Sequence, residues 1–327
     1  MQSRKPLGII LFLITALIWG CAFVAQSVAA EVVGPFTFQS LRSFLGFLVL
    51  LPVIAAMDSV RRRHAGHAGA LPADAGASPG TPSADGDPRK ARRTLIKAGI
   101  LCGIFLTVAS VFQQYALTIG APAGKAGFIT AFYLLLVPVF GLIFLHKKTR
   151  PVIWLCVAIA LAGLYFLCAA GLGSSGAGIA VSDIFLILCA VCFAVQILII
   201  DHFVQLVDGV KMACIEFLTS GILAGIFMLI VERPAAADII AAGKPLLYAG
   251  LLSSGVAYTL QIVGQKFIEP TVASMLMSLE SVFAVLSAIV ILGQMPTARE
   301  WIGCALMFAA ILLSQLPERK RAAAGNA

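Results

Sequence analysis

Long apolar runs separated by short polar turns dominate the hydrophobic pattern of the 327-residue chain. An α-helix needs about 20 apolar residues to cross a hydrocarbon layer of about 30 Å. The pattern predicts ten such helices, numbered below as the first to the tenth span, over residues 7–29, 36–57, 96–119, 126–146, 151–171, 179–200, 211–231, 245–264, 271–293 and 299–316. We therefore expect an all-α integral membrane protein with ten transmembrane helices.

The composition agrees with this pattern. The chain is 60% hydrophobic and 12% charged, whereas soluble domains carry about 25% charged residues. The net charge of +8 does not indicate nucleic acid, because the basic residues gather beside the spans. All eight cysteines lie in apolar runs, and the Cys189-x-x-Cys192 pair has no companion ligand cluster, so we expect no metal site and no cofactor.

The basic residues also predict the orientation. If the N-terminus is cytoplasmic, the outer turns carry only Lys125, Arg233, Lys244 and Arg299 of the 23 lysines and arginines. Excess positive charge marks the cytoplasmic side. The sequence therefore predicts a multi-pass protein of the inner (plasma) membrane with both termini cytoplasmic.

Residues 58–93 interrupt the apolar pattern. The segment carries arginine clusters at both ends and an Ala/Gly/Pro/Ser/Asp stretch between them. Such a composition is typical of disorder. We interpret it as a disordered cytoplasmic loop, with partner binding as the alternative.

The chain also resembles itself. A shift of 174 residues lays residues 10–28 over 184–202 and places Arg42 on Glu216; a shift of 143 lays residues 138–144 over 281–287. The predicted halves, 1–171 and 172–327, have five spans each, and an odd number of crossings inverts the second half relative to the first. Inverted-topology repeats form the scaffold of many secondary transporters, whose binding sites lie near the midplane.

Glu280 lies inside the ninth span, about 14 Å from Thr271 along a helix that rises about 1.5 Å per residue. On an unbroken helix Ala273 and Ala284 share its side, whereas Met275 and Val282 lie opposite, so the acid is expected to face helices or a cavity. An ionisable residue at this depth is a candidate functional site. It is our candidate for proton coupling or for contact with a cationic group. The alternative is a protonated acid in one interhelical hydrogen bond.

Other polar residues within the spans have two interpretations each. Arg42 either extends to the outer interface or attracts an anionic group in a cavity, and Glu216 is interpreted as an interfacial or interhelical group at a different depth. Amides suit a zwitterionic or polar solute but also join helices; those considered are Gln113, Gln114 and Gln261. Four residues near mid-depth either line a cavity or pack inside the bundle: Trp19, Tyr133, Gln196 and Tyr258.

Two small-residue pairs, Gly99/Gly103 and Gly221/Gly225, occur within the spans. Such pairs let helices approach closely. We interpret them as sites of helix packing, with a homodimer contact as the second interpretation.

In these features the chain resembles the EamA-like, ten-span members of the drug/metabolite transporter (DMT) superfamily. The resemblance is carried by Trp19-Gly20, by Arg42, by residues 112–117 (FQQYAL), by residues 127–141 (GFITAFYLLLVPVFG) and by residues 257–286. Where such proteins usually read Leu-Glu-Pro and Gly-Glu, this chain has Leu279-Glu280-Ser281 and Gly293-Gln294. The missing proline removes the expected cause of a kink in the ninth span.

The resemblance implies a secondary transporter that exports small metabolites or amino-acid-like compounds. Glu280 makes protons the candidate coupling ion. A passive channel remains an alternative because channels also contain midplane acids. A lipid-modifying membrane enzyme is a further alternative, although the sequence contains no HExxH or GxSxG motif. We therefore expect a transporter and not an enzyme.

Overall fold

The computed structural model describes residues 5–67, 88–121, 123–146, 149–168, 180–292, 295 and 297–314, and all regular secondary structure in them is helical. The first half contains α1 (Lys5–Ala30), α2 (Pro35–His67), α3 (Pro88–Thr118), α4 (Ala123–Thr130), α5 (Tyr133–Leu145) and α6 (Pro151–Cys168). The second half begins with α7 (Val181–Phe203), α8 (Gly209–Phe227), the π-helix η3 (Met228–Glu232), α9 (Ala236–Ala241) and α10 (Gly243–Leu247). It continues with the π-helix η4 (Tyr248–Tyr258), α11 (Thr259–Gln265), α12 (Pro270–Met277), α13 (Glu280–Leu292) and α14 (Ala298–Ser314).

Each predicted span corresponds to a helix or to consecutive helices. Within the described residues, seven helical segments are long and apolar enough to cross a membrane: Lys5–Ala30, Pro35–Arg63, Pro88–Thr118, Lys125–Leu145, Val181–Phe203, Gly209–Glu232 and Gly243–Gln265. Shorter apolar helices over Pro151–Leu167 and Pro270–Leu286 take the places of the fifth and ninth spans, and α14 takes that of the tenth. The prediction of an all-helical membrane protein is confirmed.

The ends of the predicted loop 58–93 are helical, which corrects the expectation of disorder there. The helix α2 continues to His67 and α3 begins at Pro88. Ion pairs to α8 hold the extended end of α2: Lys211 Nζ lies 2.9 Å from Asp58 Oδ1, and Arg61 Nη2 lies 2.8 Å from Asp208 Oδ2. Residues 68–87, the Gly293-Gln294 pair and the basic residues 319–321 lie outside the described residues.

Contacts between the two halves come in equivalent pairs. The helix α1 packs against η4 and α11 as α7 packs against α3, and α2 packs against η4 as α8 packs against α3. Likewise, α1 contacts α12 and α13, whereas α7 contacts α4 and α5. The pairs α2–α8 and α6–α14 match themselves when the halves are exchanged. This arrangement is what two repeats related by a pseudo-two-fold axis produce.

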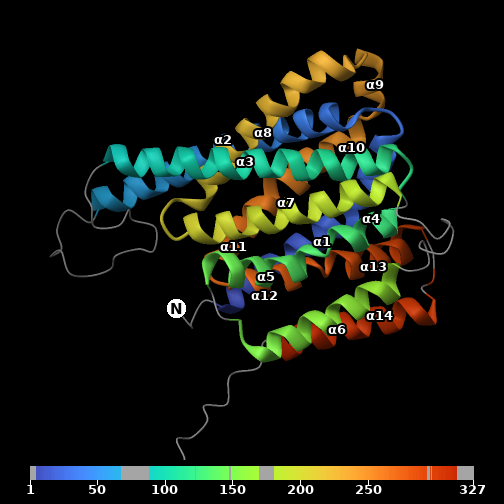
Figure 1. The fold of residues 1–327 in the computed structure, drawn as a ribbon. Helices are drawn as coiled ribbons and strands as arrows, with labels where there is room; N and C mark the ends of the chain where they lie inside the picture. The colour runs from blue at the N-terminus through green and yellow to red at the C-terminus, as the bar shows by residue number, and fades with distance from the viewer. Residues whose placement is uncertain are drawn as a thin grey trace, which may run out of the picture.

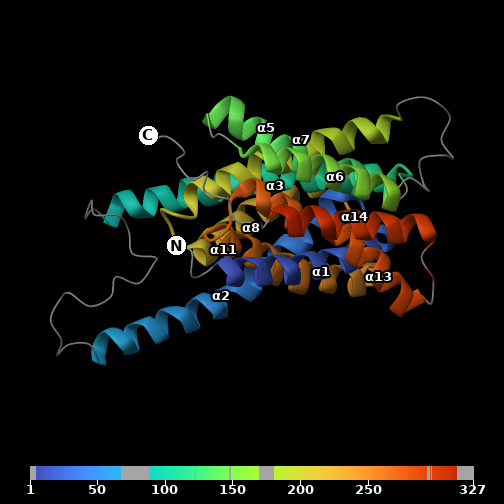
Figure 2. The same ribbon diagram turned by 90° about the horizontal axis from the view of Figure 1, so that it is seen from below.

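Figures 1 and 2 show the helices running lengthwise through one bundle, with α6 and α14 side by side at its edge. The helix α1 begins and α14 ends at the end of the bundle where α2 ends and α3 begins (Figures 1 and 2). An even number of crossings gives this placement.

The glycine pairs are used for packing within the chain. A Cβ at Gly99 would lie 2.5 Å from Cβ of Ile215, and one at Gly103 would lie 2.7 Å from the carbonyl oxygen of Glu216. A Cβ at Gly221 would lie 3.1 Å from the Phe44 ring. These glycines therefore bring α3 close to α8, and α8 close to α2.

The fourth and ninth spans are each broken near their middle, although the ninth lacks the proline that was the expected cause of a kink. The chain leaves the α-helix at Ala131–Phe132 and again at Ser278–Leu279. At the second break, the Ser278 hydroxyl donates to the Met275 carbonyl at 2.7 Å, and the Leu279 N–H donates to Leu276 at 3.3 Å. Serine side chains that bond to nearby carbonyls compete with the helical pattern, so this break occurs without a proline.

This break also changes which residues are buried. All side chains from Pro270 to Val282 are buried, including those of Met275 and Val282. The ninth span therefore does not have one buried face with Glu280 and an opposite, exposed face with Met275 and Val282.

Candidate functional site

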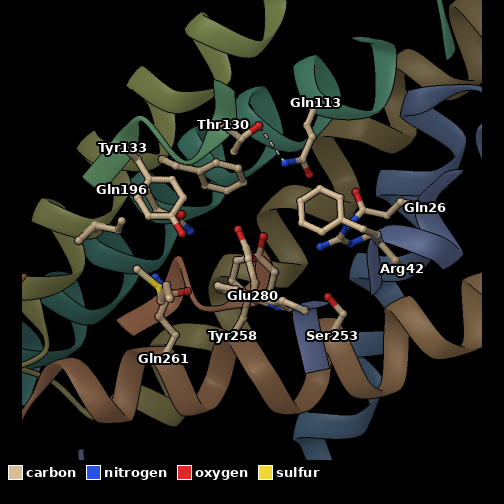
Figure 3. Close-up of a pocket in the computed structure, with 15 residues that line it drawn as sticks. Gln26, Arg42, Gln113, Thr130, Tyr133, Gln196, Ser253, Tyr258, Gln261 and Glu280 are labelled. Carbon is tan, nitrogen blue, oxygen red and sulfur yellow. Dashed lines mark hydrogen bonds between the residues drawn. The ribbon is translucent and has the colours of Figure 1, made fainter. Parts of the chain in front are cut away.

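A cavity lies at the centre of the bundle, where both broken spans meet the first, second, third, sixth and eighth spans (Figure 3). Its volume is about 40 Å³. One water needs about 10–15 Å³, so the cavity holds roughly three waters. The lining residues are Trp19, Phe23, Gln26, Arg42, Gln113, Thr130, Tyr133, Phe193, Gln196, Ile197, Ser253, Tyr258, Gln261, Met277 and Glu280.

Helical spacing explains how the first span contributes to the lining. Trp19, Phe23 and Gln26 follow one another at intervals of four and three residues, which places them on one face of α1. Trp19 also packs against Tyr258 with ring centroids 4.6 Å apart. This contact joins the first span to the eighth, its neighbour in the other half.

Arg42 is a buried guanidinium group without an acidic partner among the described residues. The side chain is 4% exposed, and its Nε donates to Ser254 Oγ at 3.3 Å. The guanidinium carbon lies 5.7 Å from the Phe38 ring centroid and 5.8 Å from that of Tyr258. Arg42 therefore lines the cavity and does not extend to the membrane interface.

Glu280 enters the cavity from the first residue of α13, directly after the break in the ninth span. Its side chain is 5% exposed, and no cation of the described residues pairs with it. Across the cavity, Tyr133 is the first residue of α5, directly after the break in the fourth span, and it lines the same cavity as Glu280 (Figure 3). The positive ends of two broken helices thus begin at the cavity, an arrangement known from transporters built from inverted repeats.

Gly20 allows α13 to reach this position. A Cβ at residue 20 would lie 2.7 Å from the carbonyl oxygen of Glu280 and 2.8 Å from the Ala284 nitrogen. A side chain at this position would push the two backbones apart. The absence of a side chain at Gly20 therefore fixes the depth of Glu280 in the bundle.

Four polar atoms of the lining residues have no hydrogen-bond partner among the described residues. They are two donors, Trp19 Nε1 and Tyr133 Oη, and two acceptors, the side-chain oxygens of Gln196 and Gln261. A buried polar group without a partner costs about 1–3 kcal/mol. These atoms are available to a polar occupant of the cavity.

The structure brings together eight of the nine predicted site residues: Trp19, Arg42, Gln113, Tyr133, Gln196, Tyr258, Gln261 and Glu280. Gln114 is the exception, because its Nε2 donates to the Gln26 carbonyl at 3.0 Å and does not line the cavity.

The polar lining residues that sequence reasoning missed are Gln26, Thr130 and Ser253. Gln26 could have been found, since it lies seven residues after Trp19 on the same helical face. Ser253 lies in the π-helix η4. The spacing of apolar residues in the sequence does not reveal the changed helical register there.

A buried ion pair joins the two halves elsewhere. Lys125 Nζ lies 2.7 Å from Asp183 Oδ1, with both side chains nearly buried. Lys125, predicted in an outer turn, thus connects α4 to the start of α7. The Ala180 N–H also donates to Asp183 Oδ2, at 3.0 Å.

Comparisons with known proteins agree with the repeat and the fold. A relative from Archaeoglobus fulgidus, described as an uncharacterized transporter, is 24% identical over 303 residues, which cover 93% of this chain and 84% of the relative. A solved structure described only as the crystal structure of a protein matches with a TM-score of 0.68 at 19% identity, covering 94% of this chain and 96% of that one. The sequence profile of the EamA-like transporter family matches twice, over residues 6–169 and 180–316. With one match in each half of the duplicated bundle, the chain belongs to the EamA-like transporter family.

Proposed function

We propose that this protein is a secondary active transporter of small amino-acid-like zwitterions, which it exports by alternating access. The observation that carries the proposal is that an unpaired base, Arg42, and an unpaired acid, Glu280, line one cavity. A guanidinium group binds a carboxylate through two parallel hydrogen bonds, and a carboxylate binds an ammonium group. A solute that carries both groups satisfies both residues.

The neutral lining residues suit the same class of solute. Gln113 and Gln261 both donate and accept hydrogen bonds, and Trp19 and Tyr258 provide an aromatic wall. An uncharged metabolite would leave Arg42 without an anion in a buried site, which is costly. The lining therefore favours a zwitterion over an uncharged compound.

Glu280 also provides a route to coupling. A buried carboxyl group can hold either a proton or the ammonium group of a solute. If the two exclude one another, protons entering the cell displace the solute outward, and neither crosses alone. Differential binding of this kind couples two ligands.

The size of the cavity means that the helices must move during transport. Space for roughly three waters does not admit an amino acid, so the helices must move to bind and release one. The breaks at Ala131–Phe132 and Ser278–Leu279 are suited to such movement. The alternative of a membrane enzyme is rejected because the chain belongs to a family of transporters.

We also propose residues 1–171 and 172–327 as the two repeat units, with both termini on the cytoplasmic side of the inner membrane. Lys125, Arg233, Lys244 and Arg299 remain the basic residues assigned to outer segments. A homodimer has no support from the glycine pairs, because they pack within the chain.

Transport of a matched set of solutes tests the substrate class. Proteoliposomes with an acidic lumen would be offered radiolabelled neutral L-amino acids, amines that lack the carboxylate, and N-acetylated amino acids that lack the ammonium group. Saturable accumulation of zwitterions alone, with an increase of about 10- to 100-fold in KM for Arg42→Gln, is expected from the loss of a charged hydrogen bond. Equal accumulation of the N-acetylated compounds or amines would overturn the two-point assignment, and equilibration without accumulation would indicate a channel.

A further inference from the structure

Glu216 is the most deeply buried acid in the described part of the chain. Its residue exposure is 0%, compared with 5% for Glu280 and 8% for Asp183. Asp183 is neutralised by Lys125, whereas neither Glu216 nor Glu280 pairs with a cation of the described residues. Glu216 was expected to be an interfacial or interhelical group, and its surroundings suggest a more specific role.

One hydrogen bond holds the Glu216 carboxyl group. Gln196 Nε2 of α7 donates to Glu216 Oε1 at 2.5 Å, and the second oxygen, Oε2, has no partner among the described residues. Gln196 itself lines the central cavity. A single glutamine side chain therefore separates this buried acid from the cavity.

The groups around Glu216 supply no positive charge. Cys102 of α3 and Tyr258 at the end of η4 are its titratable neighbours. The α11 segment, which also packs against α8, contains no titratable residue. Arg42 of α2 stacks over the Tyr258 ring and Lys211 of α8 pairs with Asp58. The other cations of α2 and α3 are exposed: Arg61, Arg62, Arg63, Arg89, Lys90, Arg92, Arg93 and Lys97.

An ionised Glu216 would be an uncompensated buried charge, which costs far more than a buried neutral group. A protonated carboxyl group avoids this cost. One turn away, neutral groups join α8 to two other helices, α2 and α3. There, Ser220 Oγ accepts hydrogen bonds from Thr107 of α3 at 2.9 Å and from Gln39 of α2 at 2.8 Å.

We propose that Glu216 is a second proton-binding site of the transporter, loaded in this conformation and linked to the central cavity through Gln196. When the cavity widens and water reaches Gln196, the Glu216 O–H bond breaks and the proton passes to a water molecule. A carboxylate remains, which is hydrated by water and accepts a hydrogen bond from the Gln196 amide. Its part in coupling rests on the proposed function, but its protonation can be measured without a solute.

Infrared spectroscopy of the purified protein in lipid nanodiscs tests this site, because a protonated carboxyl group has its own C=O absorption. At neutral pH, Glu216→Gln is expected to lose one such band while retaining the fold, since the amide oxygen can still accept from Gln196. Glu280→Gln provides the reference for the other unpaired acid. A Glu216→Gln spectrum that keeps every protonated-carboxyl band of the wild type would overturn the proposal.

A second variant tests the link to the cavity. Gln196→Leu removes the donor to Glu216 and is expected to shift its C=O band. Gln265→Leu is the matched control, because Gln265 is also a buried amide, donates to the neighbouring Ile197 carbonyl at 3.0 Å and does not line the cavity. A band that moves equally in both variants, or in neither, would overturn the link.

The two proposals fail separately. If no zwitterion is transported, the infrared bands still decide whether Glu216 holds a proton. If Glu216 proves to be ionised, the transport assay still decides the roles of Arg42 and Glu280.

Discussion

Arg42 and Glu280 face the same cavity from α2 and α13, yet they form no ion pair with one another. One is a base and the other an acid, and both side chains are at least nine-tenths buried. An ion pair within the protein would have neutralised both groups and closed the site to a solute. The separation leaves both groups without a partner within the described part of the protein.

Neighbouring glutamines provide a matched test of the cavity lining. Gln113→Leu removes a lining amide that also donates to Thr130 Oγ1 at 3.3 Å, so we expect KM for the transported solute to rise about tenfold, the effect of losing a hydrogen bond of about 1.4 kcal/mol. Gln114→Leu removes only an interhelical bond, worth about 0.6 kcal/mol in membranes. Its KM should stay within about twofold of the wild type. Equal changes in radiolabelled uptake for both variants would contradict the position of the cavity.

Gly20→Ala should impair transport because the added Cβ meets the backbone of α13 at Glu280. Overpacking of this kind costs about 1–3 kcal/mol, and here it also displaces the acid. We expect uptake to fall at least about tenfold while the protein still folds. Gly141→Ala is the control, because its Cβ would meet no atom within 4 Å. Wild-type uptake by Gly20→Ala would show that the depth of Glu280 is unimportant.

Much of the architecture can be predicted from the sequence because a membrane restricts the choices. Apolar length predicts the spans, and polar side chains at mid-depth must converge, since lipid cannot satisfy them. Trp19, Arg42 and Glu280 could therefore be identified before their surroundings were known. The rotation of each helix could not: Gln113 and Gln114 differ by about 100° around α3, and only tertiary packing decides which of them faces the cavity.

The break in the ninth span was also beyond sequence reasoning. Its expected cause, a proline after Glu280, is absent, and serine side chains bond to backbone carbonyls at the break. The π-helical stretch of the eighth span changes the register of Ser253 in a way that an apolar run does not reveal.

Ser281→Pro should be tolerated because the break already exists. Ser281 is the second residue of α13, and its N–H donates only a long hydrogen bond of 3.3 Å to Ser278. Proline is accepted in the first turn of a helix. We expect thermal stability in detergent to change by less than about 1 kcal/mol, whereas Val285→Pro, inside α13, should cost about 3 kcal/mol. Comparable losses in both variants would contradict the position of the break.

Removing one partner of the Lys125–Asp183 pair should lower the stability of the protein more than removing both partners. Lys125→Met leaves Asp183 buried without a cation, and removal of one partner of a buried pair costs about 3–5 kcal/mol. The double variant Lys125→Met/Asp183→Leu should recover part of that loss. Unfolding in mixed micelles measures both variants. A double variant less stable than Lys125→Met would show that the ion pair is not what makes the single change costly.

The coupling role of Glu280 is tested most directly by the accumulation of radiolabelled neutral L-amino acids in proteoliposomes with an acidic lumen. The wild type is compared with Glu280→Gln. The wild type is expected to accumulate zwitterions above their external concentration, and collapse of the pH gradient should abolish this. Glu280→Gln cannot exchange a proton, so it should lose accumulation while its unfolding in detergent stays close to that of the wild type. Unchanged proton-driven accumulation in Glu280→Gln would contradict the role assigned to this acid.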